Sequence, residues 1–77
     1  MAKKHRHKFV IRRKDLGLTQ QDIATAAGVT TRTVQLWEAG THMPSLSFSQ
    51  VADLCELLRC SVRDLAKDFE PKNNQTP

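Results

Sequence analysis

A run of hydroxyl, guanidinium and amide side chains occupies residues 30–35, and such groups can exchange hydrogen bonds with the edges of nucleic-acid bases. On a helix over residues 31–39, Val34 and Trp37 share one side and are expected to point inward. The opposite side then carries Thr31, Arg32, Gln35 and Leu36. An apolar residue among polar ones suits a thymine methyl group, which favours reading of the DNA major groove over a solvated polar face.

No pattern typical of an enzyme accompanies these residues. The sequence shows no nucleophile paired with a base, no glycine-rich phosphate loop and no set of metal ligands at the usual spacing. His5 and His7 are separated by one residue, but a zinc site needs three or four converging ligands and nothing nearby completes one. His42 is expected in a loop. We therefore predict no catalytic activity, no metal and no cofactor.

Length and charge narrow the possible partners. The chain has 77 residues, and 12 Lys and Arg against 8 Asp and Glu give a net charge of +4. A chain of this size forms one domain with a thin core, and its positive charge favours an anionic partner. The apolar runs are far shorter than the roughly 20 residues of a membrane span or than a signal-peptide core, so a soluble, cytoplasmic protein is expected.

The pattern of helix starts and stops predicts an all-α fold of five short helices, over about 8–16, 20–27, 31–39, 48–58 and 62–69. Their capping residues are Thr19, Thr30, Ser47 and Ser61. Gly17, Gly28 and Gly40 end the first three helices. Arg59 occupies the corresponding place after the fourth, so that end is expected to be 3₁₀-like or strained.

Composition divides the chain into three parts. Residues 1–8 form a flexible basic arm that carries Lys3, Lys4, Arg6 and Lys8. This arm either lies along a DNA duplex, with Arg6 in a minor groove, or is simply solvated. Residues 9–70 form the folded domain, and the polar tail 71–77 is expected to be disordered.

The second and third predicted helices form a compact pair. Ile23, Ala24 and Ala27 share one face of the second helix, and their small side chains allow a close helix crossing. Gly28 permits a sharp turn into the third helix. Two helices at a steep angle joined by a short turn with glycine form a helix-turn-helix.

Residues in this pair and around it resemble the lambda-repressor/Cro (xenobiotic-response-element) family of bacterial and phage regulators. The resemblance spans about residues 9–69. It is carried by a set of motif residues in the family's order and spacing: Gly17, Leu18, Thr19, Gln20, Ile23, Ala24, Gly28, Val29, Thr30, Val34, Trp37, Glu38, Gly40, Pro44 and Ser45. It implies a compact five-helix DNA-binding domain.

The resemblance also implies individual roles. The residues expected to contact DNA from the domain itself are Gln20, Thr30, Thr31, Arg32, Thr33, Gln35, Leu36, Thr41 and His42. Gln20 would bind a phosphate and brace the third helix, while Arg13 would form a structural pair with Glu38. Thr41 and His42 replace the family's usual basic loop residues, and the arm would compensate. The link from Pro44 to the fourth helix is about two residues longer than usual.

The last two helices are expected mainly to complete the core, with these side chains on one side: Val51, Leu54, Cys55, Leu58, Cys60, Val62, Leu65 and Phe69. Cys55 and Cys60 are poorly placed for a disulfide and are expected to be buried, reduced thiols. Alternatively, Leu57, Ala66 and Phe69 are exposed and form a two-fold contact. Any homodimer would then be weak or induced by DNA.

These observations predict a sequence-specific regulator of transcription that binds double-stranded DNA, with repression as the expected mode. The alternative is a protein-interaction module, such as an antitoxin or an adaptor, built on the same fold.

Overall fold

The computed structural model describes residues 7–69, which form five helices and, in that range, no strand. The helices are α1 (His7–Asp15), α2 (Gln20–Ala27), α3 (Thr31–Ala39), α4 (Phe48–Leu58) and α5 (Val62–Phe69). The predicted all-α fold is confirmed, and only the first range differs, by one residue. The sequence assigns His7 and Lys8 to the arm, but both lie in α1.

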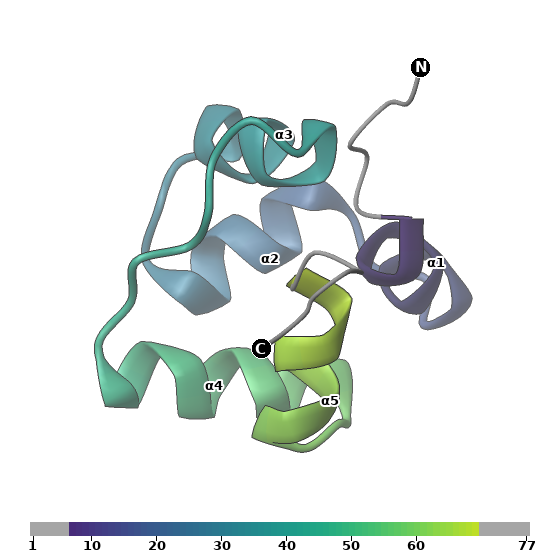
Figure 1. The fold of residues 1–77 in the computed structure, drawn as a ribbon, viewed down its shortest axis with the longest axis vertical. Helices are drawn as coiled ribbons and strands as arrows, with labels where there is room; N and C mark the ends of the chain where they lie inside the picture. The colour runs from purple at the N-terminus through teal and green to yellow at the C-terminus, as the bar shows by residue number, and fades with distance from the viewer. Residues whose placement is uncertain (1–6, 70–77) are drawn as a thin grey trace, which may run out of the picture.

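Helix α2 lies in the middle of the molecule, between α3 on one side and α4 on the other (Figure 1). Helix α1 packs against α5 and the end of α3, and α5 also contacts α4. In the part of the chain described, no helix is both long and apolar enough to cross a membrane. The arrangement leaves one side of α3 at the edge of the molecule (Figure 1).

Side-chain caps fix the first turns of the helices where the sequence predicts them. At the start of α2, the Asp22 N–H donates to the Thr19 hydroxyl at 3.0 Å, and the Thr19 N–H donates to the Asp22 carboxylate at 2.8 Å. The same reciprocal bonds begin α4 and α5, in the pairs Ser47–Gln50 and Ser61–Asp64. The hydrogen bond from the Ser61 N–H lowers the pKa of Asp64.

The ends of α2 and α4 each carry a residue in the left-handed conformation, a glycine in one and an arginine in the other. Gly28 ends α2 with φ 71°, and a Cβ there would lie 3.2 Å from the side-chain nitrogen of Gln50. That nitrogen donates to the Ala27 carbonyl at 2.9 Å, so the turn also fastens α4 to α2. Arg59 ends α4 with φ 53° and is the one non-glycine residue with positive φ in residues 7–69. The strain expected at this end is therefore present in its backbone.

The core draws on all five helices. Its buried apolar members are Phe9, Ile23, Ala24, Ala27, Val34, Trp37, Leu54, Cys55, Leu58, Leu65 and Phe69. The predicted inner face of α2 is fully buried, because Ile23, Ala24 and Ala27 are each 0% exposed. Two alanines on that face keep its side chains short, which lets α3 and α4 pack closely on either side.

Two expectations for the last two helices are wrong, and one alternative is contradicted. Val62, expected in the core, is 59% exposed, because it is the first residue of α5 and lies at the edge of the α4–α5 turn. Phe69 is buried as the core assignment predicts, with its ring 4.7 Å from that of Phe9, which contradicts the alternative of an exposed Phe69 in a two-fold contact. Cys60 is only partly buried, whereas Cys55 is buried; both thiols are free.

An ion pair that the sequence does not reveal connects α1 to α5. The Arg12 Nε donates to Asp68 at 2.7 Å, and the Asp68 side chain is only 2% exposed. This hydrogen bond raises the pKa of Arg12. The two residues are 56 positions apart, so only the packing of α5 onto α1 brings them together.

Replacement of Arg59 by glycine should raise the free energy of unfolding by about 0.5–1 kcal/mol. Glycine avoids the Cβ penalty of about 1–2 kcal/mol at positive φ, and its greater freedom in the unfolded chain offsets part of that gain. Arg59→Ala is the matched control, since it removes the same side chain but keeps the Cβ. Urea unfolding of the three proteins measures the difference, and equal stability of the two variants would contradict the assignment of strain.

Candidate nucleic-acid interface

Helix α3 has a buried side and an accessible side. Val34 is 0% exposed and Trp37 is 2% exposed, whereas Arg32 and Gln35 are exposed. The Trp37 indole meets the Phe69 ring edge-on, with 6.1 Å between their centroids. This arrangement fixes the rotation of α3 about its own axis, so that the guanidinium of Arg32 is directed outward.

The accessible side of α3 is less exposed to solvent than the sequence predicts. Thr31, Thr33 and Leu36 are each only partly exposed. Leu36, interpreted above as an exposed apolar residue, therefore keeps part of its side chain against the protein. The remaining exposed part still lies one turn beyond Arg32, on the same helix.

A buried ion pair holds the C-terminal half of α3 in place. The Arg13 Nε donates to Glu38 at 2.7 Å, and the two side chains are 9% and 11% exposed. Arg13 also donates to the Leu18 carbonyl at 2.9 Å, at the connection between α1 and α2. One guanidinium thus joins three elements: α1, the connection that follows it, and α3.

Gln20 extends this network to the accessible side. Its amide nitrogen donates to Glu38 at 2.9 Å, and its amide oxygen accepts a longer hydrogen bond of 3.4 Å from Gln35. The side chain thus connects the buried carboxylate to an exposed amide of α3. The bracing that the family resemblance implies for Gln20 is present in this geometry.

A second connection joins the start of α2 to the start of α3. The Thr31 hydroxyl donates to the Gln21 amide oxygen at 2.8 Å, and the Gln21 amide nitrogen donates to the Thr25 hydroxyl at 3.1 Å. Gln21 is not among the residues that the sequence predicts for this site. No signal in the sequence points to it, because the contact depends on the crossing of the two helices.

The N-terminus of α3 is capped by a threonine pair. The Thr30 hydroxyl accepts from the Thr33 N–H at 3.1 Å, and the two hydroxyls lie 3.0 Å apart. Thr30 is exposed, so its hydroxyl is accessible beside the first turn of α3. The positive end of the helix dipole lies at this turn, where it favours a phosphate group.

The family model described as helix-turn-helix matches residues 11–65, which is more than half of the chain. The chain belongs to the lambda-repressor and Cro-like helix-turn-helix family. It is therefore a DNA-binding helix-turn-helix regulator, and its partner is double-stranded DNA. A search of the curated proteins and a search of the solved structures each found no match.

In this helix-turn-helix domain, the loop after α3 begins with two polar side chains, Thr41 and His42. Thr41 donates its hydroxyl hydrogen to the Leu36 carbonyl at 3.1 Å, and the His42 Nδ1 lies 3.2 Å from the Thr41 hydroxyl. Both side chains are exposed. The start of this loop can thus offer hydrogen-bonding groups to a phosphate, but no lysine or arginine.

The basic residues proposed for the arm separate into two groups. Lys3, Lys4 and Arg6 lie outside the described residues. Lys8 is an exposed residue of α1 that borders a surface hollow together with Leu58 and Asp68. Lys8 therefore faces the side of α1 where α4 ends and α5 packs, rather than the side next to α3.

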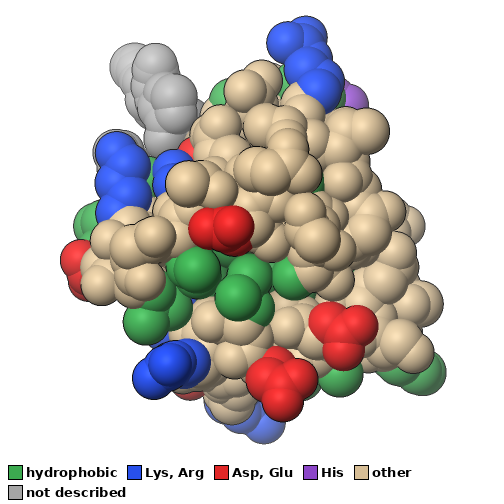
Figure 2. Space-filling view, turned by 180° about the vertical axis from the view of Figure 1, so that it is seen from behind, with side chains coloured by type: hydrophobic (Ala, Val, Ile, Leu, Met, Phe, Trp, Pro, Cys, Tyr) green, Lys and Arg blue, Asp and Glu red, His purple; other side chains and the backbone are tan. Residues whose placement is uncertain are grey.

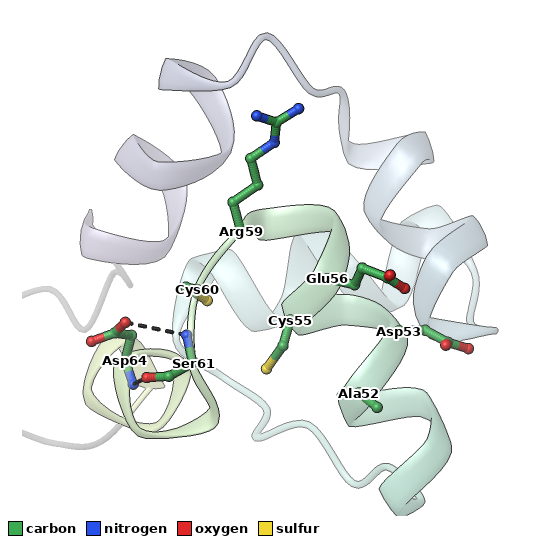
Figure 3. A pocket seen from close by; sticks show the side chains of 8 residues that line it. All are labelled: Ala52, Asp53, Cys55, Glu56, Arg59, Cys60, Ser61 and Asp64. Carbon is green, nitrogen blue, oxygen red and sulfur yellow. Dashed lines mark hydrogen bonds between the residues drawn. The ribbon is translucent and has the colours of Figure 1, made fainter.

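A hollow over α4 and the start of α5 brings several titratable groups together (Figure 3). Burial raises the pKa of the Cys60 thiol to about 11, so it is protonated at neutral pH and a poor nucleophile. The Asp64 carboxylate is held by the Ser61 N–H, and the Arg59 side chain points away from the carboxylates (Figure 3). In residues 7–69, no three His, Cys, Asp or Glu side chains are grouped to hold a metal.

Arg13→Met should lower the free energy of unfolding by about 3 kcal/mol or more. The substitution leaves the Glu38 carboxylate buried without its guanidinium, which typically costs about 3–5 kcal/mol. Lys14→Met is the control, because Lys14 is exposed and carries the same charge. Urea unfolding at neutral pH compares them; a loss no greater than that of the control would show that the pair does not stabilise the fold.

Proposed function

We propose that this domain is a sequence-specific transcriptional repressor that reads the major groove with α3. The observation that carries the proposal is the fixed outward position of Arg32 opposite the buried Trp37. An α-helix fits the major groove, where each base pair has a distinct pattern of donors and acceptors. Where the bound site overlaps a promoter, occupancy alone represses, because a protein held in the groove blocks the duplex to polymerase.

The distribution of charge supports this orientation. Figure 2 shows a Lys or Arg side chain that projects from the edge where α3 lies in Figure 1, whereas acidic side chains lie over the centre and, together with other Lys and Arg side chains, over the lower part of the view. A duplex is strongly anionic, so it is attracted to the projecting positive charge at the edge with α3.

The proposed contacts divide into two classes. Thr31, Arg32 and Leu36 face base edges, with Arg32 suited to a bidentate contact to guanine. The residues proposed to contact the backbone or to flank the site are Gln20, Thr30, Thr33, Gln35, Thr41 and His42. Phosphate contacts position the protein on the duplex, whereas base contacts provide the specificity.

We also infer that two copies bind neighbouring half-sites, about 10–10.5 base pairs apart or a multiple of that spacing. An apolar groove supports this inference, with Met43, Pro44, Leu46, Val51 and Val62 among its lining residues. Val62 and the partly exposed Ala66 offer apolar surface there, and the buried Phe69 also lines this groove.

The competing function is a protein-interaction module. One observation favours it: Phe48, the first residue of α4, is 95% exposed, and large apolar side chains are often contact residues for proteins. Titration against DNA separates the two functions. Binding that is weak and indifferent to sequence would favour the interaction module.

Arg32→Ala should weaken binding to a selected site by about 1–3 kcal/mol and relax the preference at one base pair. Arg63→Ala is the matched control, because Arg63 is also exposed but lies on α5. Oligonucleotides selected from a random pool supply the site, and fluorescence anisotropy at fixed salt measures both affinities. Equal losses in the two variants would mean that Arg32 contributes only its charge.

Removal of residues 3–6 should flatten the dependence of log K on log salt concentration, by nearly one unit for each lost phosphate contact. Lys8→Ala should leave that slope unchanged, since Lys8 faces the end of α4. The comparison is made by titration at several salt concentrations. If the shortened and full chains give the same slope, the arm does not contact the duplex.

A further inference from the structure

We propose that Gln21 is a positioning residue for base recognition: it makes Thr31 a hydrogen-bond acceptor, so that Thr31 selects a base with an exocyclic amino group. This inference rests on the proposed function, because it assumes that Thr31 meets a base edge. Gln21 itself need not touch DNA. Gln21 instead determines whether the Thr31 hydroxyl donates or accepts the hydrogen bond to a base.

The geometry that carries the inference is a chain of two hydrogen bonds. Thr31 donates to the Gln21 oxygen at 2.8 Å, and the Gln21 nitrogen donates to Thr25 at 3.1 Å. Gln21 and Thr25 lie one turn apart on α2, so the amide is held at both of its ends. Donation therefore runs in one direction, from α3 into α2.

The direction of donation decides what Thr31 can offer. A threonine hydroxyl has one hydrogen and two lone pairs. Since the hydrogen is directed to Gln21, only lone pairs remain for a partner in the groove. Hydrogen bonds in such a chain polarise one another, which strengthens the acceptor character of this oxygen.

The bases differ in whether they present a donor or an acceptor to Thr31 in the major groove. Adenine presents its N6 amino group in the major groove and cytosine its N4 amino group, whereas guanine and thymine present carbonyl oxygens there. An acceptor opposite an amino group forms a hydrogen bond. An acceptor opposite a carbonyl leaves both groups unsatisfied. Thr31 therefore favours adenine or cytosine on the strand that it faces.

Gln20, next to Gln21 in the sequence, contacts other residues of α3. The Gln20 amide is engaged by Glu38 and Gln35, so its removal should not change which hydrogen-bonding role the Thr31 hydroxyl has. Position 21 is exposed and lies in the first turn of α2. It therefore accepts substitution by either charge with little effect on folding.

The test compares Gln21→Glu with Gln21→Lys. A carboxylate can only accept, so Gln21→Glu keeps the Thr31 hydrogen directed inward; an ammonium can only donate, so Gln21→Lys releases that hydrogen towards the groove. Both variants change the attraction to phosphates. The measured quantity is therefore the ratio of affinities for two sites that differ at one base, from which this charge effect cancels.

The experiment begins with a site selected from a random pool by the wild-type chain. Thr31→Val, which removes the hydroxyl and nearly keeps the shape, identifies the base whose discrimination depends on that group. At this base, the wild-type chain and Gln21→Glu should prefer adenine or cytosine over guanine or thymine by about tenfold, which is within the range of a specific contact. Gln21→Lys should lose or reverse that preference.

Three results would overturn the inference. A preference kept by Gln21→Lys and lost by Gln21→Glu would mean that donation runs in the opposite direction. A preference unchanged in both variants would mean that Gln21 does not set the role of Thr31, although the domain still reads DNA. If the wild-type pool yields no selected sequence, the proposed function itself fails, and the inference fails with it.

Discussion

The orientation of the proposed DNA-contacting side of α3 depends on the burial of Trp37. Helix α3 has nine residues, and its largest side chain within the core is this indole, which packs against Phe69 at the end of α5. A short helix has little intrinsic stability, so its position is determined by such tertiary contacts. Once the indole is fixed, Arg32 has no position available except outside the protein. The orientation of the exposed side is thus a consequence of packing on the buried side.

An ion pair and hydrogen bonds between polar side chains hold the helices together in addition to the small apolar core. The Arg13–Glu38 pair is costly to bury, yet it has a second use, because Gln20 bonds to the same carboxylate and reaches Gln35 on the accessible side. A group on the protein surface is thereby connected to a buried charge through two hydrogen bonds. The same side chains stabilise the fold and arrange the proposed DNA contacts. A substitution at one of them should therefore change both the stability of the domain and its binding to DNA.

The sequence predicts the helices well because their signals are local. The caps Thr19, Thr30 and Ser47 act within a single turn, and the periodicity of Val34 and Trp37 depends only on helix geometry. What the sequence could not predict depends on distance in space: the Arg12–Asp68 pair and the link from Thr31 to Gln21 both require knowledge of how helices cross. The exposure of Val62 was missed because its position at the start of α5, rather than its hydropathy, decides its environment.

The two glutamines at the start of α2 contact opposite ends of α3. Gln20 and Gln21 are adjacent, and side chains of adjacent residues point about 100° apart around a helix. One amide therefore reaches the end of α3 at Glu38, and the other reaches its start at Thr31. Holding α3 at both ends restrains its tilt as well as its rotation, and both must be fixed if three side chains are to meet particular bases. The second glutamine then adds a chemical constraint to the mechanical one, because the direction in which its amide bonds also determines the role of the hydroxyl that it holds.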